Sequence, residues 1–563
     1  MSFWKNGPAV WITGLLLVSL LPAACGGGRP AFSETPAKAP TLLSLEPSPP
    51  AADLWLAPGD VLVYPGPERY SGDILSFDVT PRNIGSIPPS AIALRLYHRT
   101  NGQREVIAEG SVGFPAYDGQ PRARLIWAWD THGLVGEQTL VAWLDPDDLI
   151  QEGDEDPTNN LLTFTLYLSP AVELPPPERG AAWMTETTAC CTLHYLSGSA
   201  AARDMSTITV AVEEAFAGVA GRLGVSSPEP LEIYFLSRVI GQGGYAYGQV
   251  AVSYLDRHYA GLDLRLVLRH EIVHVLDARL FQVYPPALLR EGLAVYLSGG
   301  HYKEEPIPRR AAALLPTGRY IPLETLAGDF YAQQHEVAYL EGAALIAYLV
   351  DTYGWEHFLR FYASFEKDLD PVPALEQALE ENFGRGREET EEAFRAWLEA
   401  HPPTSEQVRD LEDTVRLFEA MRRYQERYDP GAYWWSGWMP DPAEGEERGI
   451  VADFIRHPRA PENLALEAML IAAQESLRAG RLTQAEALLD GIERVLESGA
   501  FSGRPEADYL ALVEAAQKAG YEVQRISLDG GQATVWAVAR WPHLEKLTFQ
   551  RTASGWTPVA VGR

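Results

Sequence analysis

The residues best suited to chemistry are two histidines four positions apart, with a glutamate directly after the first: His270, Glu271 and His274. Side chains four apart on an α-helix lie on one face, one turn above each other, so both imidazoles can reach a single Zn²⁺ ion. Glu271 projects beside that face, where it can take a proton from a metal-bound water. The spacing therefore predicts a zinc centre that has its own general base.

Glu291 is the candidate for a third ligand. Sixteen residues separate it from His274, enough for a loop and a returning helix. The residues after Glu291 are mostly apolar, which predicts burial, and a buried carboxylate needs a partner. The alternative is a glutamate on a solvated helix face. If Glu291 is not the ligand, Glu336 and Glu341 on a later helix are the substitutes.

The apolar pattern around these residues predicts alternating strands and helices. An uninterrupted helical period over 262–281 places both histidines on one helix, and a second short helix follows Tyr284 and two prolines. Upstream, the expected elements are a strand at 190–195, a helix at 204–223 ended by Gly224, a strand at 231–236, a glycine-rich turn at 241–244 and a strand at 247–254.

On these residues, the segment 187–402 resembles the gluzincin (peptidase MA-like) metallopeptidases. Residues 288–294 read Leu-Leu-Arg-Glu-Gly-Leu-Ala, which matches the Glu-Gly-x-Ala part of that family's third-ligand helix but lacks its aromatic residue. The resemblance implies that His270, His274 and Glu291 are zinc ligands and that Glu271 is the catalytic base. It also implies that the strand at 247–254 is the sheet edge beside the cleft, where an extended peptide can pair.

Peptide hydrolysis needs a further group to stabilise the oxyanion. The resemblance implies a Tyr or His from a helix after the third ligand, and the candidates are Tyr339 and His301. Tyr339 is the predicted catalytic residue, with a buried core tyrosine as the alternative.

The length of the chain indicates its number of domains, and its charge excludes some classes of partner. A chain of 563 residues is too long for one core and indicates several domains. A net charge of −30 argues against nucleic acid and against binding of an anionic membrane through the protein surface. The predicted partner is a peptide or protein substrate, and the oligomeric state stays open.

The N-terminus predicts export. Lys5 precedes a short apolar run over 9–21, followed by small residues and Cys25, which is typical of a signal peptide. Ala-Ala-Cys followed by glycines resembles a bacterial lipoprotein signal, which implies a lipid anchor at Cys25 on the outer face of the membrane. An ordinary cleaved signal is the alternative. Cys190 and Cys191 are adjacent. They either form a disulfide bond with each other or are two small buried residues without a bond, and the sequence favours neither alternative.

The predicted architecture is multidomain. An N-terminal immunoglobulin-like β-sandwich resembles CARDB domains through an acidic loop that runs into Asn159 and Asn160. This loop predicts either a Ca²⁺ site or, preferably, a solvated turn. A central α+β zincin-like domain, a C-terminal helical region and a small α+β module follow. The predicted segments are a signal peptide (1–24), a tether (25–52), the sandwich (53–169), a proline-rich linker (170–186), the peptidase domain (187–402), the helical region (403–500) and the module (501–563).

Together these features predict a zinc-dependent peptidase, preferably an endopeptidase, that acts outside a bacterial cell. The alternative is a surface adhesion or scaffold protein whose peptidase-like domain is inactive. The modular layout favours this alternative, whereas the complete set of ligands and base argues against it.

Overall fold

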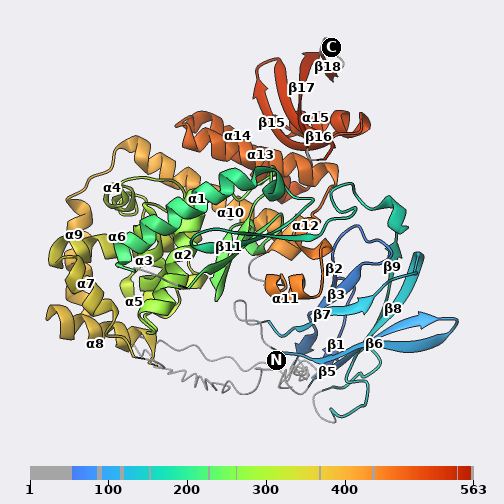
Figure 1. The fold of residues 1–563 in the computed structure, drawn as a ribbon, viewed down its shortest axis with the longest axis horizontal. Helices are drawn as coiled ribbons and strands as arrows, with labels where there is room; N and C mark the ends of the chain where they lie inside the picture. The colour runs from blue at the N-terminus through green and yellow to red at the C-terminus, as the bar shows by residue number, and fades with distance from the viewer. Residues whose placement is uncertain are drawn as a thin grey trace, which may run out of the picture. The chain divides into compact units, whose positions relative to one another are not determined.

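The computed structural model describes residues 53–559 except 85–91, 114–119, 151–153, 226–228, 262, 367–368, 434–437, 542 and 554. The predicted signal peptide, Cys25 and nearly all of the tether lie outside these residues. The described chain begins with β-strands, continues through a mixed sheet with helices, and ends with helices and a β-meander (Figure 1). The prediction of a β-rich N-terminal region followed by α+β and helical parts is confirmed at this level.

The N-terminal β-region has a three-stranded sheet (β2-β3-β7), a four-stranded sheet (β6-β5-β8-β9) and the pair β1-β4. Leu75 and Phe77 from one main sheet and Leu94 and Leu96 from the other are fully buried in one core. Alternating apolar residues predict strands over 74–79, 91–97, 125–129 and 139–144, and the structure has a strand at each of these places. The strands are β1 (Asp53–Trp55), β2 (Val61–Tyr64), β3 (Ile74–Val79), β4 (Arg82–Ile84), β5 (Ala93–Thr100), β6 (Gln103–Ser111), β7 (Ala123–Asp130), β8 (Gly136–Leu144) and β9 (Leu161–Leu168).

The acidic loop between β8 and β9 uses its carboxylates to hold its own turn. Asp145 accepts N–H hydrogen bonds from Leu149 and Ile150 at 3.0 and 2.8 Å. Asp147 pairs with Arg95 at 2.6 Å. Among the loop residues that the structure describes, which leave out Glu152, no three carboxylates converge as a Ca²⁺ site would require. The acidic-turn alternative is therefore the better supported one.

A five-stranded mixed sheet follows, in the order β10-β11-β12-β14-β13, with antiparallel strands at both edges. Its strands are β10 (Trp183–Thr187), β11 (Cys191–Leu196), β12 (Leu231–Leu236), β13 (Gly244–Tyr247) and β14 (Gln249–Ser253). The edge prediction is wrong: the strand expected at 247–254 is the inner strand β14. The edge is β13, which begins at the last residue of the predicted glycine-rich turn. Gly248, at a φ of 72°, makes the tight reversal between them.

The first four of the five residues of strand β10 lie within the stretch predicted to be a linker. This strand pairs with β11 over its whole length, from Trp183 opposite Leu196 to Thr187 opposite Thr192. The sheet therefore begins four residues before the predicted start of the peptidase domain, because a linker and an exposed edge strand are alike in composition.

Both faces of this sheet are covered. Ile233 and Phe235 of β12 pack with helices α1 (Ala200–Leu223) and α2 (Leu264–Leu280) in the largest core. The alternate residues Tyr234 and Leu236 belong to a second cluster that includes Phe454 of α12 (Ala452–Ile455). Two buried faces explain why β12 is apolar at successive positions over 233–236 and does not alternate there.

Helices complete the central region and cross into the C-terminal one. Those after α2 are α3 (Ala287–Ser298), α4 (Ile307–Ala312), α5 (Leu323–Gly328), α6 (His335–Tyr353), α7 (Trp355–Tyr362), α8 (Pro371–Phe383), α9 (Arg387–Glu399) and α10 (Ser405–Tyr428). Helix α10 places Leu411 and Val415 in the largest core, and Leu417 and Met421 in the C-terminal core. One helix therefore belongs to both cores, and the predicted boundary at 402 is not a break in packing.

The C-terminal part has helices followed by a small α+β unit, as the sequence predicts. Helices α13 and α14 form a hairpin, and α15 precedes a four-stranded meander in the order β15-β16-β17-β18 (red in Figure 1). The elements are α11 (Pro442–Glu447), α13 (Pro461–Arg478), α14 (Leu482–Ser498), α15 (Glu506–Lys518), β15 (Glu522–Asp529), β16 (Gln532–Arg540), β17 (His543–Thr552) and β18 (Gly555–Pro558).

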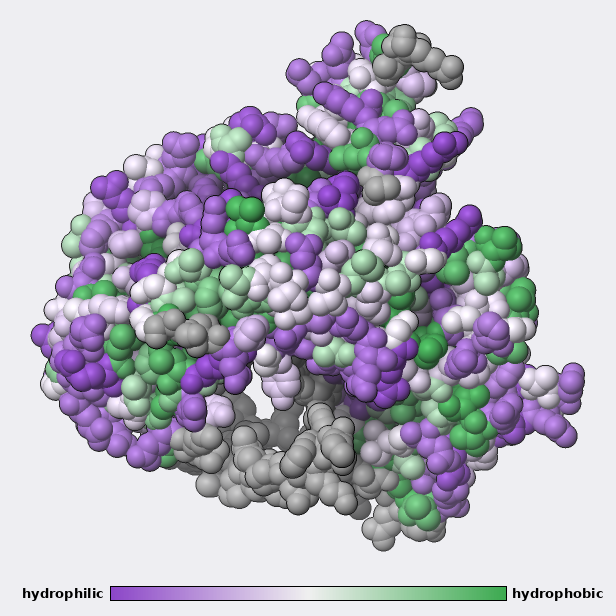
Figure 2. Space-filling model, viewed as in Figure 1, coloured by the Kyte–Doolittle hydropathy of each residue, from purple (hydrophilic) through white to green (hydrophobic). Residues whose placement is uncertain are grey.

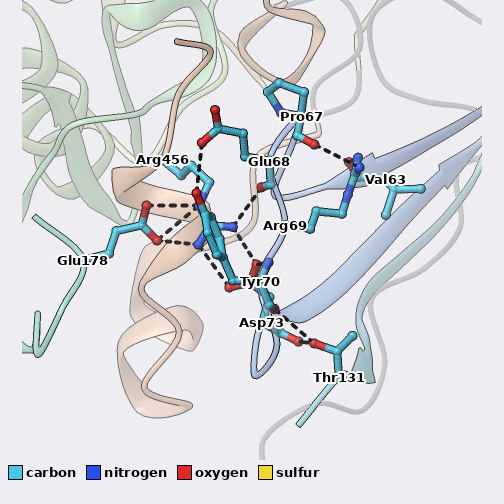
Figure 3. Close-up of polar contacts among 9 residues, drawn as sticks. All are labelled: Val63, Pro67, Glu68, Arg69, Tyr70, Asp73, Thr131, Glu178 and Arg456. Atoms are coloured by element: carbon cyan, nitrogen blue, oxygen red, sulfur yellow. Dashed lines mark hydrogen bonds and ion pairs between the residues drawn. The ribbon is translucent and has the colours of Figure 1, made fainter. Parts of the chain in front are cut away.

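Arg456, directly after α12, connects the N-terminal β-region to the rest (Figure 3). Its guanidinium lies 2.6 Å from Asp73 of that region and pairs with Glu178 of the proline-rich segment. It also donates to the carbonyl oxygen of Glu68 at 3.1 Å and lies over the ring of Tyr70. Because removing one member of a buried ion pair strands the other charge, this network opposes separation of the segments it joins.

Cys190 and Cys191 form a disulfide bond between adjacent residues. Cys191 is fully buried in the largest core, and Cys190 packs against it. Of the two alternatives for this pair, the structure therefore has the disulfide bond.

The surface agrees with the composition. Hydrophilic residues cover most of the face shown in Figure 2, as expected for a chain with a net charge of −30. Within the described part of the chain, no helix combines the length and the apolar character needed to cross a bilayer.

Candidate metal centre

Helix α2 carries three of the predicted site residues. It begins at Leu264, where the Asp263 side chain accepts the N–H of Arg265 at 2.9 Å and so caps the helix. Its apolar face packs in the largest core, so the opposite face, which carries His270 and His274, points away from that core. The Nε2 atoms of His270 and His274 lie 3.1 Å apart there, and their side chains are 15% and 19% exposed. Both imidazoles therefore remain accessible from outside.

Helix α3 brings Glu291 to these histidines. Gly292 makes this possible: a Cβ atom there would lie 2.6 Å from the backbone of Gly342, so only glycine lets α3 and α6 approach so closely. The Glu291 side chain is 8% exposed, and its Oε2 lies 3.3 Å from His270 Nε2 and 3.1 Å from His274 Nε2. The Glu291 carboxylate therefore faces both imidazoles.

The three donor atoms have the separations that a tetrahedral metal site needs. Ligands about 2.0 Å from a tetrahedral Zn²⁺ lie about 3.3 Å from each other, and the three observed separations are 3.1, 3.1 and 3.3 Å. Two imidazole nitrogens and a carboxylate oxygen are also a donor set that zinc accepts. Among the residues that the structure describes, this is the one group of His, Cys, Asp or Glu that could hold a metal ion.

Glu271 lies beside the triad, against the edge strand. A Cβ atom on Gly244 of β13 would be 3.1 Å from Glu271 Oε1, so the strand backbone passes directly over this carboxyl group. Burial raises the pKa of Glu271 to about 8; His274 opposes this shift and Glu291 adds to it. A divalent cation at the triad would lower this pKa again and favour the carboxylate that a general base requires.

The ligand candidates differ in protonation. Burial lowers the pKa of His270 to about 4, so this imidazole is neutral. Burial also acts to lower the pKa of His274, but the carboxylate of Glu291 outweighs it and raises the pKa to about 9. For Glu291 the two histidines outweigh burial and hold its pKa well below the ordinary value. The triad therefore holds one proton that a metal ion would displace.

A phenol that the sequence does not reveal touches the triad. Tyr331, in the short turn η4 (Phe330–Ala332), donates a hydrogen bond to Glu291 Oε1 at 2.6 Å, which leaves Oε2 facing the histidines. Nothing in the local sequence marks Tyr331, because a three-residue turn has no periodicity.

The two predicted oxyanion candidates lie further back. The ring of Tyr339 is 6.0 Å from that of His270, and burial raises its pKa well above the ordinary value, so its hydroxyl stays protonated. His301 stacks on Tyr339 at 4.8 Å, and its Nδ1 lies 2.5 Å from Glu336. Tyr339 is thus the nearer candidate, and its catalytic role stays a prediction.

The two substitutes for Glu291 are engaged elsewhere. Glu336 lies between His301 and Arg310, and Glu341 accepts the N–H of Ile321 at 3.0 Å. Neither carboxylate joins the group at the two histidines.

The chain was compared with known proteins: no protein-family model matches it, and no curated protein sequence matches it. The gluzincin and CARDB resemblances therefore stay predictions, based on the residues named above.

Proposed function

We propose that the protein is a zinc-dependent peptidase, with His270, His274 and Glu291 as ligands and Glu271 as general base. The observation that carries the proposal is the convergence of three donor atoms at 3.1–3.3 Å, beside a buried carboxyl group. When bound, Zn²⁺ would polarise the scissile carbonyl and make water more acidic. Glu271 would take the proton of the attacking water and return it to the leaving amine.

The edge strand suggests how a substrate lies. One side of β13 pairs with β14, and its backbone passes Glu271 at Gly244. An extended peptide that adds to the other side of β13 would place a carbonyl near Glu271. A strand-like binding mode needs no free amino terminus, which favours an endopeptidase.

The signal-like N-terminus adds a location to the proposal. Residues 1–25 favour export from a bacterial cell and a lipid anchor at Cys25, which would hold the peptidase on the outer face of the membrane. Mass spectrometry of the mature N-terminus, with and without Cys25→Ser, tests the anchor.

Two measurements test the activity. Metal analysis of purified, chelator-free protein should give about one zinc per chain. Wild type should cleave casein or a mixed peptide library, and Glu271→Gln should lower the rate about a thousandfold or more while retaining zinc. Glu213→Gln, an exposed substitution on α1, is the matched control. If both proteins bind zinc and a cell-surface partner and neither cleaves peptides, the chain is a scaffold with an inactive domain.

A further inference from the structure

A cavity of about 530 Å³ lies between the carboxyl ends of three parallel strands and the C-terminal α+β module. Gly198, Ser237 and Asp256 line it, and they follow β11, β12 and β14 within three residues. Residues of the module, within 517–524 and 538–541, also line it, and we call it the strand-end cavity. In open sheets with parallel strands, the crevice outside the carboxyl ends of the strands is the usual place for a ligand.

The strand-end cavity has the size and the access that a ligand needs. Binding sites for small molecules measure roughly 300–1,000 Å³. Pro176 and Gly520 line the cavity and are exposed, so it opens to solvent. None of the described residues that line it is Glu271 or a member of the triad. The cavity is therefore distinct from the candidate metal centre.

Three polar side chains in the wall of the cavity have hydrogen-bonding capacity left. Ser237 is 5% exposed, and its hydroxyl makes no hydrogen bond to any other residue that the structure describes. The same is true of the His457 imidazole within the described part of the chain. Gln524 is 7% exposed, and its amide makes one hydrogen bond, to Glu522 at 3.3 Å. Because buried polar groups are normally hydrogen-bonded, these side chains point to a bound polar molecule.

The charged residues of the cavity wall are already compensated. Three ion pairs hold all but one of those that the structure describes: Arg459 with Glu522 at 2.6 Å, Asp256 with Arg203 at 2.8 Å, and Arg456 with Glu178 (Figure 3). The remaining one, Glu68, is exposed and accepts a hydrogen bond from the Tyr70 hydroxyl at 3.1 Å. A charged ligand would compete with these pairs, so the wall favours an uncharged one.

The open polar groups are those that suit hydroxyl groups. A serine hydroxyl, a neutral imidazole and a primary amide each offer a donor and an acceptor, as an alcohol does. Burial, helped by the nearby charge of Arg257, holds the pKa of His457 well below its ordinary value, so this imidazole is neutral. A carboxylate or phosphate would need donors alone, and an ammonium group would need acceptors alone. Tyr521 and Trp541 also line the cavity, half-buried, and their rings provide flat apolar surfaces.

We propose that the strand-end cavity binds a saccharide of about one or two sugar units. A sugar ring is uncharged, carries several hydroxyl groups and has an apolar face of C–H bonds. Its hydroxyl groups suit the side chains of Ser237, His457 and Gln524, and its apolar face suits the ring of Trp541. The inference does not depend on the proposed peptidase activity and adds a second kind of ligand to the protein.

Titration calorimetry of the purified protein with a panel of uncharged sugars tests the inference. The panel contains glucose, galactose, mannose, N-acetylglucosamine, maltose, cellobiose and N,N′-diacetylchitobiose. At least one of these should bind with a Kd below about 1 mM, whereas acetate and ethylamine should not bind. Absence of binding for every sugar, or binding of the charged compounds in their place, would overturn the inference.

Variants test whether a bound sugar lies in the strand-end cavity. Trp541→Ala and Ser237→Ala should each weaken binding about tenfold, the effect of one lost stacking or hydrogen-bonding contact. Trp536→Ala on β16 and Ser206→Ala on α1 lie outside the cavity and should bind as wild type does. If Trp541→Ala does not fold, Ser237→Ala decides, because it removes a single oxygen atom.

Unchanged affinity in the cavity variants would overturn the inference. Glu271→Gln should bind the sugar with the affinity of wild type, because Glu271 does not line the cavity. A protein that binds sugar and cleaves no peptide would contradict the proposed function alone.

Discussion

Two clusters of histidine and glutamate lie on either side of Tyr339. Each contains a buried glutamate, and a different kind of positive charge compensates the carboxylate in each. In the triad, Glu291 faces two imidazoles and the Tyr331 hydroxyl. In the second cluster, Glu336 contacts His301 at 2.5 Å and Arg310 at 3.5 Å, and Arg310 also pairs with Asp410. The rings of His270 and His301 both contact Tyr339, at 6.0 and 4.8 Å.

The difference shows what makes a group of ligands available to a metal. A buried carboxylate must be compensated, and the guanidinium of Arg310 supplies a permanent charge to the second cluster. In the triad the compensating charge is a proton on His274, whose pKa is raised to about 9. A proton can be exchanged for a cation, whereas a guanidinium cannot. We therefore expect the triad to bind zinc, and the second cluster to contribute to the stability of the folded protein.

The largest effect should come from Glu291→Ala. This change removes one of three ligand candidates and its charge, so zinc affinity should fall by orders of magnitude, measured by competition with a chromophoric chelator. Glu336→Ala is the equivalent truncation in the second cluster. The folded fraction of this variant should bind zinc with nearly the affinity of wild type. Equal zinc affinities for Glu291→Ala and wild type would contradict the comparison.

Arg310→Met should affect stability and not metal. The Arg310 side chain is 3% exposed, and losing it leaves the buried carboxylates of Glu336 and Asp410 short of a partner. Breaking a buried pair costs about 3–5 kcal/mol of unfolding free energy, which urea denaturation would measure. Arg409→Met, an exposed change on α10, is the control. A loss of zinc without a loss of stability would reverse the roles assigned to the two clusters.

Tyr331→Phe should weaken zinc binding by about 10–100-fold, because a residue that orients a ligand carboxylate has this effect on metal affinity. The hydroxyl holds Glu291 Oε1, and without it the carboxylate can turn away from the histidines. Tyr339→Phe is the matched control. The Tyr339 ring contacts His270, but the Tyr339 hydroxyl makes no hydrogen bond to Glu291. If both variants bind zinc as wild type does, Tyr331 does not position the ligand.

The last effect, modest for each single pH unit, is the dependence of zinc affinity on pH. His270, with a pKa of about 4, is already neutral, whereas His274, with a pKa of about 9, holds a proton that zinc must displace. Zinc affinity should therefore rise at least about tenfold per pH unit between about pH 5 and 8, because the His274 proton always leaves and zinc also lowers the pKa of Glu271. Calorimetry at pH 6 in buffers of different ionisation enthalpy should show release of about one to two protons per zinc, one from His274 and the rest from Glu271, whose pKa zinc lowers from about 8. Release near zero would mean that the triad is not compensated by a proton.

Much of the site follows from local sequence, because its spacing is a property of one helix. The period over 262–281 places His270, Glu271 and His274 on α2, and the apolar surroundings of Glu291 correctly predict its burial. Alternation likewise predicts β3, β5, β7 and β8 of the β-region, since each of these strands has one face in a core. These predictions need only the geometry of a helix or a strand.

Tertiary structure alone decided which distant residues meet. Whether Glu291, Glu336 or Glu341 faces the histidines depends on the close approach of α3 and α6 at Gly292 and Gly342, which no local pattern contains. The edge of the sheet is β13 and not β14, because strand order is a matter of pairing and not of composition. A contact across 40 residues of sequence also brings the Tyr331 hydroxyl to Glu291.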